Sequence, residues 1–237
     1  NYTDFLDEYG DTVKMMGAAP ELDGAFELGE ELAKRGIVAS VAHSSGNYDT
    51  AYESLNHGFS DITHIYNACT SCYKEGVFRR AGTVEAALSD DRFSVQAISD
   101  LVHLPVGVLR LIYKAKGSDK MYLITDGLEF SAFDMNEGEE FTQKNGVKVV
   151  YEDEVMKLSD RSCLAGSTAN GARLVRNMYK TVGVPLTEAV KMMTLTPARV
   201  IGVDSYKGKI AEGYDADIIL FDENVEVSSV MINGKLN

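Results

Sequence analysis

The sequence predicts an α/β fold of the (β/α)8 barrel type, incomplete in this chain, with about five of the eight strands. Apolar segments with strand character alternate with amphipathic helical segments, which is typical of parallel strands joined by helices. Three of these strands carry a residue that can bind a metal or transfer a proton at or near the carboxyl end: His43 in 37–43, His64 in 62–67 and Asp126 in 121–126. Because such ends meet at one face of a barrel, we expect the three side chains to form one site.

Breaker residues mark the first elements. Residues 13–19 are predicted to form a strand that ends at Pro20. The apolar positions of residues 21–35 recur at helical spacing, and Gly36, which follows directly, is a typical helix stop. A strand is therefore expected over 37–43, immediately after that helix.

The same alternation continues as far as residue 126. A helix is expected from about residue 48 to 56, because Gly58 follows it. Another is expected over 105–115, because proline suits the first turn of a helix. The remaining elements of this part are the strands 62–67, 93–98 and 121–126 and a helix over 82–88.

Beyond residue 126 the pattern changes. Residues 127–162 contain Asn145-Gly146 between alternating apolar and polar positions, which predicts a loop and a hairpin over the barrel mouth. Helices are expected over 166–179 and 186–201. Residues 208–234 alternate with period two between glycine turns and predict a small β-sheet outside the barrel.

The number of strands suggests how the chain is divided. A closed barrel needs eight strands, and about five are found before the pattern changes. We expect residues 1–204 to form a partial hydrolase barrel and residues 205–237 to form part of a small β-sandwich. The sequence begins with Asn1 instead of a methionine, and we infer that three earlier strands belong to a preceding region.

Charge and composition favour a small-molecule substrate. The chain has 23 Lys and Arg against 36 Asp and Glu, a formal charge of -13 at pH 7, which would repel a nucleic-acid backbone. No apolar run approaches the roughly 20 residues that cross a bilayer, and the amino terminus has no signal-peptide character. The three cysteines are too few for a disulfide framework. We therefore expect a cytoplasmic protein without nucleic-acid or membrane partners.

Cys69 and Cys72 have the spacing of a redox motif or of half a zinc site. A structural zinc needs four ligands, and the third cysteine, Cys163, lies far along the chain. We therefore assign no metal to this pair.

Several short motifs occur in an order that resembles a known family. They are Ala19-Pro20-Glu21, Ala42-His43-Ser44, Thr63-His64-Ile65-Tyr66-Asn67-Ala68, Thr125-Asp126-Gly127 and Leu164-Ala165-Gly166-Ser167. From about residue 13 to the carboxyl end, the chain resembles N-acetylglucosamine-6-phosphate deacetylases of the amidohydrolase superfamily. His43 and His64 lie 21 residues apart, which fits that family's pair of histidine ligands.

The resemblance implies hydrolysis of N-acetylglucosamine 6-phosphate to glucosamine 6-phosphate and acetate. It implies one divalent metal, expected to be zinc with iron or another divalent ion as alternatives, held by His43, His64 and a glutamate. Asp126 matches the aspartate that takes a proton from the attacking water and passes it to the leaving amine. The positions that match substrate-binding residues are Asn67, Ala68, Arg79, His103, Leu164 and Gly166.

The sequence departs from the family pattern at the metal. No segment matches the His-Leu-Glu-Gly-Pro-type motif that carries the glutamate ligand, and the family's carbonyl-polarising histidine is also absent. Glu21 matches a position that is not a ligand. Position 127 is Gly where Ala is usual, and residues 99–103 replace the usual Ala-Asp-Gly before His103.

Two alternative functions are left open. Another amidohydrolase, such as a cyclic-amide hydrolase or a deaminase, would share His43, His64 and Asp126 but lack the phosphate-binding features. The chain could instead bind sugar phosphate without turnover, because a glutamate ligand is missing.

Association with a second copy is also expected. An open barrel exposes unpaired backbone groups at its edges, and such edges favour association. We therefore expect a homodimer, with aggregation or a companion polypeptide that supplies the earlier strands and the glutamate ligand as alternatives. In the family that the chain resembles, the phosphate-binding arginine can reach in from a neighbouring subunit. Arg79 is preferred to Arg80 for that role only because of its spacing to Gly82.

Overall fold

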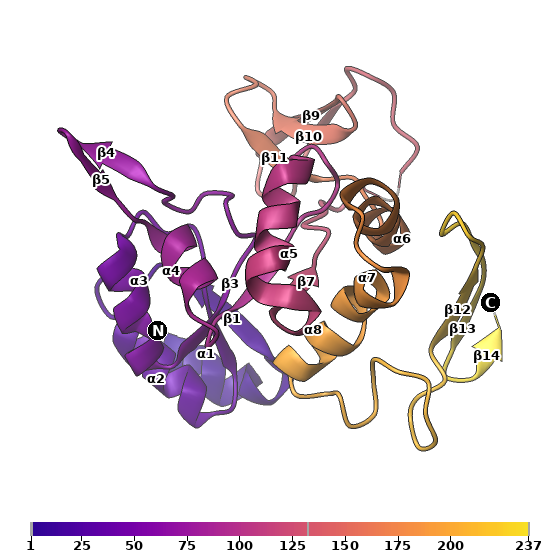
Figure 1. Cartoon of the computed structure of the whole chain (residues 1–237), viewed down its shortest axis with the longest axis horizontal. Helices are drawn as coiled ribbons and strands as arrows, with labels where there is room; N and C mark the ends of the chain where they lie inside the picture. The colour runs from indigo at the N-terminus through magenta and orange to yellow at the C-terminus, as the bar shows by residue number, and fades with distance from the viewer. Residues whose placement is uncertain (1, 132, 237) are drawn as a thin grey trace.

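The computed structural model describes residues 2–131 and 133–236. A five-stranded parallel sheet forms its centre, with the strand order β1-β2-β3-β6-β7, so that consecutive strand–helix units are neighbours (Figure 1). Its strands are β1 (Met15–Ala18), β2 (Val38–Val41), β3 (Phe59–Ile62), β6 (Ser94–Ala97) and β7 (Met121–Leu123). The predicted α/β architecture with five strands of a barrel is therefore confirmed.

The helices between these strands begin and end where local chemistry favours it. At the start of the third helix, the Asn47 side chain accepts a hydrogen bond from the backbone N–H of Thr50, and the left-handed backbone of Gly58 (φ 87°) ends the turn after that helix. The elements are α2 (Ala25–Lys34), α3 (Tyr48–Ser54) with the 3-10 turn η2 (Leu55–His57), α4 (Thr83–Ser89) and α5 (Val106–Lys120). Helix α1 (Tyr2–Tyr9) and the turn η1 (Gly10–Thr12) precede β1 and were not expected from the sequence.

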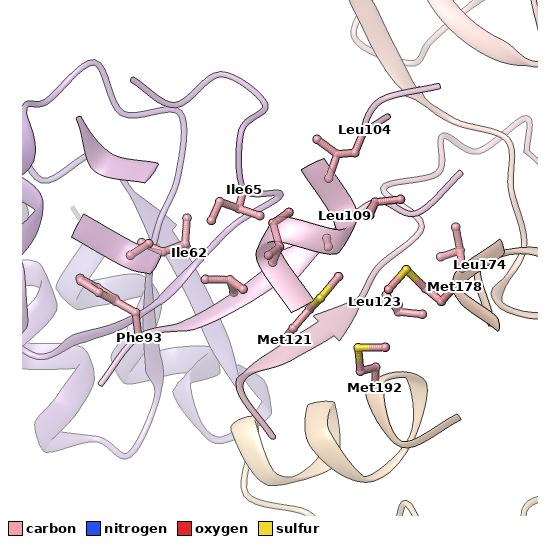
Figure 2. Close-up of a cluster of buried hydrophobic side chains, with 14 of the residues drawn as sticks. Ile62, Ile65, Phe93, Leu104, Leu109, Met121, Leu123, Leu174, Met178 and Met192 are labelled. Atoms are coloured by element: carbon pink, nitrogen blue, oxygen red, sulfur yellow. The ribbon is translucent and has the colours of Figure 1, made fainter. Parts of the chain in front are cut away.

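The main core lies between the sheet and its helices. Alternate residues of the strands, such as Ile62, Met121 and Leu123, are buried on this side with Leu109 and Ile112 of α5 (Figure 2). Because successive side chains of a strand point to opposite faces, the intervening residues lie on the inner face of the sheet. Residues from the later helices, Leu174, Met178 and Met192, complete this core.

One strand lies earlier in the chain than predicted. The segment 62–67 was expected to form it, but β3 ends at Ile62. His64 (φ 30°) and Tyr66 (φ 74°) have left-handed backbone that no strand accommodates. His64 and Asn67 therefore lie in the turn that follows β3.

The helix predicted over 166–179 begins later. Leu164–Ser167 is a strand, β11, and the helix α6 starts at Gly171, where the side chain of Asn170 accepts a hydrogen bond from the N–H of Arg173. It continues as the π-helical segment η3 (Asn177–Val182).

The helix predicted over 186–201 is divided. It forms α7 (Leu186–Met193) and α8 (Leu195–Val200), separated at Thr194. Pro197 accounts for the break, because proline lacks an N–H and its ring clashes with the carbonyl four residues earlier in a continuous helix.

In the described part of the chain, three antiparallel sheets lie outside the parallel one, and the third of them is at the carboxyl end. Residues 73–80, in a stretch that the sequence left irregular, form a hairpin of β4 (Tyr73–Glu75) and β5 (Phe78–Arg80), which projects from the body of the molecule (Figure 1). The hairpin expected within residues 127–162 is present as part of a larger sheet. That sheet has the order β11-β10-β9-β8, with β8 (Glu140–Thr142), β9 (Lys148–Glu152) and β10 (Val155–Leu158). A parallel bridge between Gly127 and Ser167 joins β11 to the chain beyond β7.

The small carboxyl-terminal sheet that the sequence predicts is present. It consists of β12 (Ile218–Phe221), β13 (Val227–Ile232) and β14 (Lys235–Leu236). Arg176 connects it to the helices, because its guanidinium donates hydrogen bonds to the carbonyls of Asn224 and Val225. The division of the chain at residues 204 and 205 stays a prediction. Among the described residues, no helix is both long and apolar enough to cross a membrane.

Candidate active site

Two histidines meet beyond the ends of β2 and β3. The Nε2 atoms of His43 and His64 lie 2.9 Å apart, with the ring centroids 4.8 Å apart. His64 is buried, whereas His43 is exposed to solvent. The two rings therefore share one location at the edge of the sheet where the parallel strands end.

The backbone at this edge is strained. His43 (φ 50°), His64 (φ 30°) and Asp126 (φ 49°), which were all predicted as site residues, have left-handed backbone. Residues other than glycine adopt this conformation at a cost, and such positions cluster at functional sites. The three predicted site residues at the carboxyl ends of β2, β3 and β7 thus share this strained conformation, which other positions such as Asp153 and Asn233 also adopt.

Asp126 acts electrostatically on His64. Burial lowers the pKa of His64, the negative charge of Asp126 opposes that shift, and the neighbouring His43 adds to it. Asp126 itself is exposed, beyond the end of β7. The three residues that the sequence brought together as a metal and proton-transfer group therefore lie at one edge of the sheet.

The histidine pair fits part of a metal site. Two nitrogens 2.9 Å apart can both lie at the usual distance of about 2.1 Å from one zinc ion. The buried Nδ1 of His64 has no hydrogen-bond partner among the described residues, so the contact of its Nε2 with His43 is the side-chain hydrogen bond that this ring makes there. Within residues 2–131 and 133–236, no group of three or more His, Cys, Asp or Glu side chains is arranged to hold a metal. The described chain thus offers two ligands and lacks the third that the family pattern requires.

Glu21 fixes the loop that follows His43. Its carboxylate accepts hydrogen bonds from the Ser44 hydroxyl at 2.8 Å and from the Ser45 N–H at 2.6 Å. Ser44 is buried and its carbonyl accepts a further bond from the N–H of Thr70. Glu21 therefore supports the loop from the end of β1.

Asn67 and Ala68 follow His64 in the same turn. The Asn67 side chain is directed back toward that turn, where its amide lies 3.3 Å from the His64 carbonyl and 3.4 Å from the Ile65 carbonyl. Ala68 is exposed and has left-handed backbone (φ 48°). The turn thus places both residues beside the histidine pair.

Arg79 lies apart from these residues, on the projecting β4–β5 hairpin (Figure 1). Its neighbour Arg80 forms an ion pair with Glu75 at 2.7 Å and lies over the ring of Phe78. Arg79 pairs with Lys74 in the ladder of this hairpin, but its side chain forms no hydrogen bond or ion pair with another described residue. Of these two neighbouring arginines, Arg80 is therefore paired and the guanidinium of Arg79 is not.

His103 is held by an aspartate that precedes it. His103 Nδ1 lies 2.7 Å from Asp100 Oδ2, and the side chains are 4% and 0% exposed. Burial alone would raise the pKa of Asp100, but hydrogen bonds from the His103 side chain, the His103 backbone and Ser167 lower that pKa to about 2. A permanent carboxylate therefore orients the His103 ring at the end of β6.

Gly166 lies against the backbone of Asp126. It has φ +113°, and a Cβ atom built on it would stand 2.7 Å from the Asp126 carbonyl oxygen. The N–H of Ser167 donates to the same oxygen at 3.1 Å. Leu164 begins the same strand and is exposed. The strand β11 thus brings the predicted substrate-binding residues Leu164 and Gly166 beside Asp126.

The sequence did not single out three supporting residues. Asp100 and Glu21 appeared within motifs, but their bonds to His103 and to the loop after His43 are visible only in the fold. Asp61, a buried acid on β3, carried no motif at all. An aspartate between Phe59 and Ile62 of a predicted parallel strand is the signal that could have found it, because buried carboxylates are rare without partners.

Comparison with known proteins shows the family of the chain. The model of the amidohydrolase family matches residues 95–236, more than half of the chain. The N-acetylglucosamine-6-phosphate deacetylase of Haemophilus influenzae is 33% identical over 232 residues, which cover 98% of this chain and 58% of that protein. The N-acetylgalactosamine-6-phosphate deacetylase of Escherichia coli O157:H7 is 29% identical over 225 residues, with coverage of 95% and 57%.

A solved structure shares the fold. It is that of a mutant N-acetyl-D-glucosamine-6-phosphate deacetylase from Mycobacterium smegmatis in complex with N-acetyl-D-glucosamine 6-phosphate. It superposes with a TM-score of 0.90 at 28% identity, over 99% of this chain and 60% of that one. This chain spans less than two thirds of the length of these relatives. The chain belongs to the amidohydrolase family, and within that family it is similar to the N-acetylglucosamine-6-phosphate deacetylases.

Proposed function

We propose that this chain acts in the metal-dependent deacetylation of N-acetylglucosamine 6-phosphate, which yields glucosamine 6-phosphate and acetate. The observation that carries the proposal is the 2.9 Å approach of His43 Nε2 and His64 Nε2 at the strand ends, within electrostatic reach of Asp126. Similarity to deacetylases of N-acetylhexosamine 6-phosphates supports the choice of substrate.

His43 and His64 would hold one divalent ion, zinc, iron or another, through their Nε2 atoms. When bound, such an ion polarises the acetamide carbonyl and lowers the pKa of a coordinated water. The lowered pKa of His64 suits this role, because only a neutral imidazole offers a lone pair to a metal. Two protein ligands are fewer than catalytic zinc sites use. We therefore expect weak or substoichiometric binding by this chain alone.

Asp126 is the residue suited to move the proton. Its carboxylate accepts a proton as the water oxygen forms a bond to the acetyl carbon, and it returns that proton to the sugar nitrogen as the carbon–nitrogen bond breaks. The nitrogen thus leaves as a neutral amine, and the acetic acid formed loses its remaining proton to give acetate. An exposed position beyond the end of β7 leaves the carboxylate accessible to a substrate.

The remaining predicted residues would bind the sugar phosphate. The Asn67 amide and the backbone of Ala68 lie beside the histidines, and His103, held by Asp100, lies at the end of the next strand. Donors of this kind and a guanidinium suit a phosphate dianion. Leu164 and Gly166 would line the sugar on the side of Asp126.

Arg79 would complete the phosphate site of a second copy of the chain. Its hairpin projects from the body and exposes Val77 (87%) and Phe78 (64%), which would be covered in a dimer (Figure 1). The unpaired guanidinium of Arg79 beside them would then reach the neighbouring mouth. A homodimer is therefore part of the proposal.

The proposal is tested by measuring free glucosamine 6-phosphate after incubation of N-acetylglucosamine 6-phosphate with the chain and added Zn²⁺. We expect release that requires metal and is lost in His43→Ala and His64→Ala. Replacement of His57, which stacks on Phe26 and pairs with Glu30 away from the site, is the matched control and should leave release unchanged. Binding of the substrate with no release at any metal concentration would instead identify a sugar-phosphate-binding protein.

Two substrate series separate the other possibilities. N-acetylgalactosamine 6-phosphate is assayed as a second substrate because one relative is named as a deacetylase of that compound. Cyclic amides test for a different amidohydrolase, which would not distinguish phosphorylated from unphosphorylated substrates.

A further inference from the structure

A layer of polar side chains lies on the inner face of the parallel sheet. It consists of Ser40 on β2, Asp61 on β3, Gln96 on β6 and Tyr122 on β7, all of them buried. Their neighbours along the strands, such as Ile62 and Met121, belong to the core on the helix side. We refer to these four residues as the interior layer.

Asp61 is the centre of this layer. Its carboxylate accepts hydrogen bonds from the Ser40 hydroxyl and the Gln96 amide, both at 2.7 Å, and from the Tyr122 hydroxyl at 3.0 Å. One side chain thus connects four strands. Gln96 also lies 3.3 Å from the sulfur of Met15 on β1, a strand that is not adjacent to β6 in the sheet. The sheet therefore curls around the interior layer.

The interior layer is in register with the histidine pair. Ser40 and Asp61 face each other across the β2–β3 ladder, 21 residues apart in the sequence. His43 lies three residues after Ser40 and His64 three residues after Asp61, so the two histidines are also 21 residues apart. The Ser40 hydroxyl is also 2.7 Å from the hydroxyl of Thr63, the residue directly before His64. The same pairing that joins Ser40 to Asp61 therefore sets where the two rings meet.

Stability alone gives little reason for this arrangement. A buried carboxylate loses hydration, and replacing buried ionic groups by well-packed apolar ones is often neutral or stabilising. Buried polar networks instead specify one arrangement of the elements that they join. The elements joined here are the strands that carry His43, His64 and, beyond β7, Asp126.

We propose that Asp61 is a positioning residue for the active site: by tying Ser40, Gln96 and Tyr122 together, it fixes the strand ends at which the His43 and His64 rings converge. This inference rests on the proposed function, because the position of the two rings matters for activity only if they bind one metal together. Asp61 touches neither the metal position nor the substrate in this role. It acts through the strands that hold the rings.

The test compares Asp61→Asn and Ser40→Ala with Val95→Ala in the whole chain. Val95 is buried on the helix side of β6, so its truncation lowers stability through a cavity while leaving the interior layer intact. Zn²⁺ affinity is measured by competition with a chromophoric chelator, and thermal unfolding is recorded for each variant. We expect the two layer variants to weaken Zn²⁺ binding about 10-fold or more, as for residues that orient metal ligands. Val95→Ala should retain the original affinity despite a lower melting temperature.

A second measurement needs no metal. Nitrogen-15 spectra of the histidine side chains in the metal-free chain report the surroundings of the His43 and His64 rings. We expect these signals to shift in the layer variants and to stay in place in Val95→Ala. Unchanged ring signals in Asp61→Asn would overturn the positioning role. It would also be overturned if the loss of Zn²⁺ affinity were proportional to the loss of melting temperature in all three variants, Val95→Ala included. Shifted signals in a chain that binds no Zn²⁺ would support the positioning and refute the proposed function.

Discussion

Gly166 and Asp126 approach so closely that position 166 has no room for a side chain. A Cβ atom there would stand 2.7 Å from the Asp126 carbonyl oxygen, and the backbone of Gly166 has φ +113°. Real Cβ atoms do not tolerate such a distance, so any other residue must displace β11 or the segment that carries Asp126. A displacement of β11 at Gly166 is thus coupled to a displacement of the segment that carries Asp126.

The first prediction follows from that contact. Gly166→Ala should reduce kcat by about 100-fold, because a displacement of about 1 Å at a catalytic group costs a factor of this size. Steady-state kinetics with N-acetylglucosamine 6-phosphate provide the measurement. Gly107→Ala, on α5 with no atom within 4 Å of the added Cβ, is the matched control and should keep full activity. Full activity in Gly166→Ala would show that Asp126 does not depend on this approach.

The second prediction concerns Asp126 directly. Asp126→Asn should lower kcat by about 10²- to 10⁴-fold, the usual contribution of a positioned acid–base group, while substrate binding changes little. Asp153, another exposed aspartate with left-handed backbone (φ 55°), lies on the β9–β10 turn and supplies the control Asp153→Asn. Turnover that is unchanged in Asp126→Asn would remove it from the mechanism.

The sequence predicted which residues are candidates for the site more readily than the backbone conformation at those residues. His43, His64 and Asp126 were predicted as site residues because each lies at or near the carboxyl end of an apolar segment with strand character. The strand that carries His64 was placed three residues too late, since Ile62, Ile65 and Tyr66 have the composition of a strand. Left-handed backbone at His64 and Tyr66 excludes a strand there, and residue composition does not reveal it.

The supporting residues could not be predicted because their partners are distant in sequence. Asp61 receives hydrogen bonds from Ser40 and Tyr122, 21 and 61 residues away. Only the parallel order of the strands brings these donors together. Gly166 and Ser167, which end β11, were predicted to begin a helix, but they pair with β10, and Ser167 forms a further bridge to Gly127, 40 positions earlier.

The third prediction separates two adjacent arginines. Arg79→Ala should raise KM for the phosphorylated sugar by about 10- to 100-fold, the effect of losing a hydrogen bond between charged groups, with little change for unphosphorylated N-acetylglucosamine. Arg80→Ala removes an exposed ion pair with Glu75, and such pairs contribute little, so both substrates should behave as before. Equal losses on both substrates in Arg79→Ala would assign that residue to folding or assembly.

The fourth prediction concerns the hairpin as a dimer contact. Phe78→Ser should raise the dimer dissociation constant by about 10- to 100-fold, because it removes an aromatic side chain that association would bury. Light scattering coupled to size-exclusion chromatography measures this over a range of concentrations. Phe133, which is 58% exposed and lies outside the hairpin, gives the control Phe133→Ser. A dimer that both substitutions leave intact would use another surface, such as the open edge of β1.

The fifth prediction is a dependence of stability on pH. Burial raises the pKa of Asp61 from 3.8 to about 6, although its hydrogen bonds with Ser40, Gln96 and Tyr122 oppose the shift. Between these values the folded chain binds more protons at this site than the unfolded chain does. The contribution of Asp61 to stability must therefore fall as pH rises through this window and level off above it.

Asp61→Asn removes this titration. We expect the difference in unfolding free energy between the original chain and the variant to decrease by about 2 kcal/mol from pH 4 to pH 7, as measured by urea denaturation. Asp100→Asn is the control of opposite sign: the folded pKa of Asp100 is lowered to about 2, so its contribution is lost only as pH falls below the unfolded value of 3.8. Above pH 5 the Asp100→Asn difference should stay constant. If the difference in unfolding free energy for Asp61→Asn stays constant or rises with pH, the Asp61 carboxyl is already ionised throughout this range. Its complete burial among Ser40, Gln96 and Tyr122 argues against that outcome.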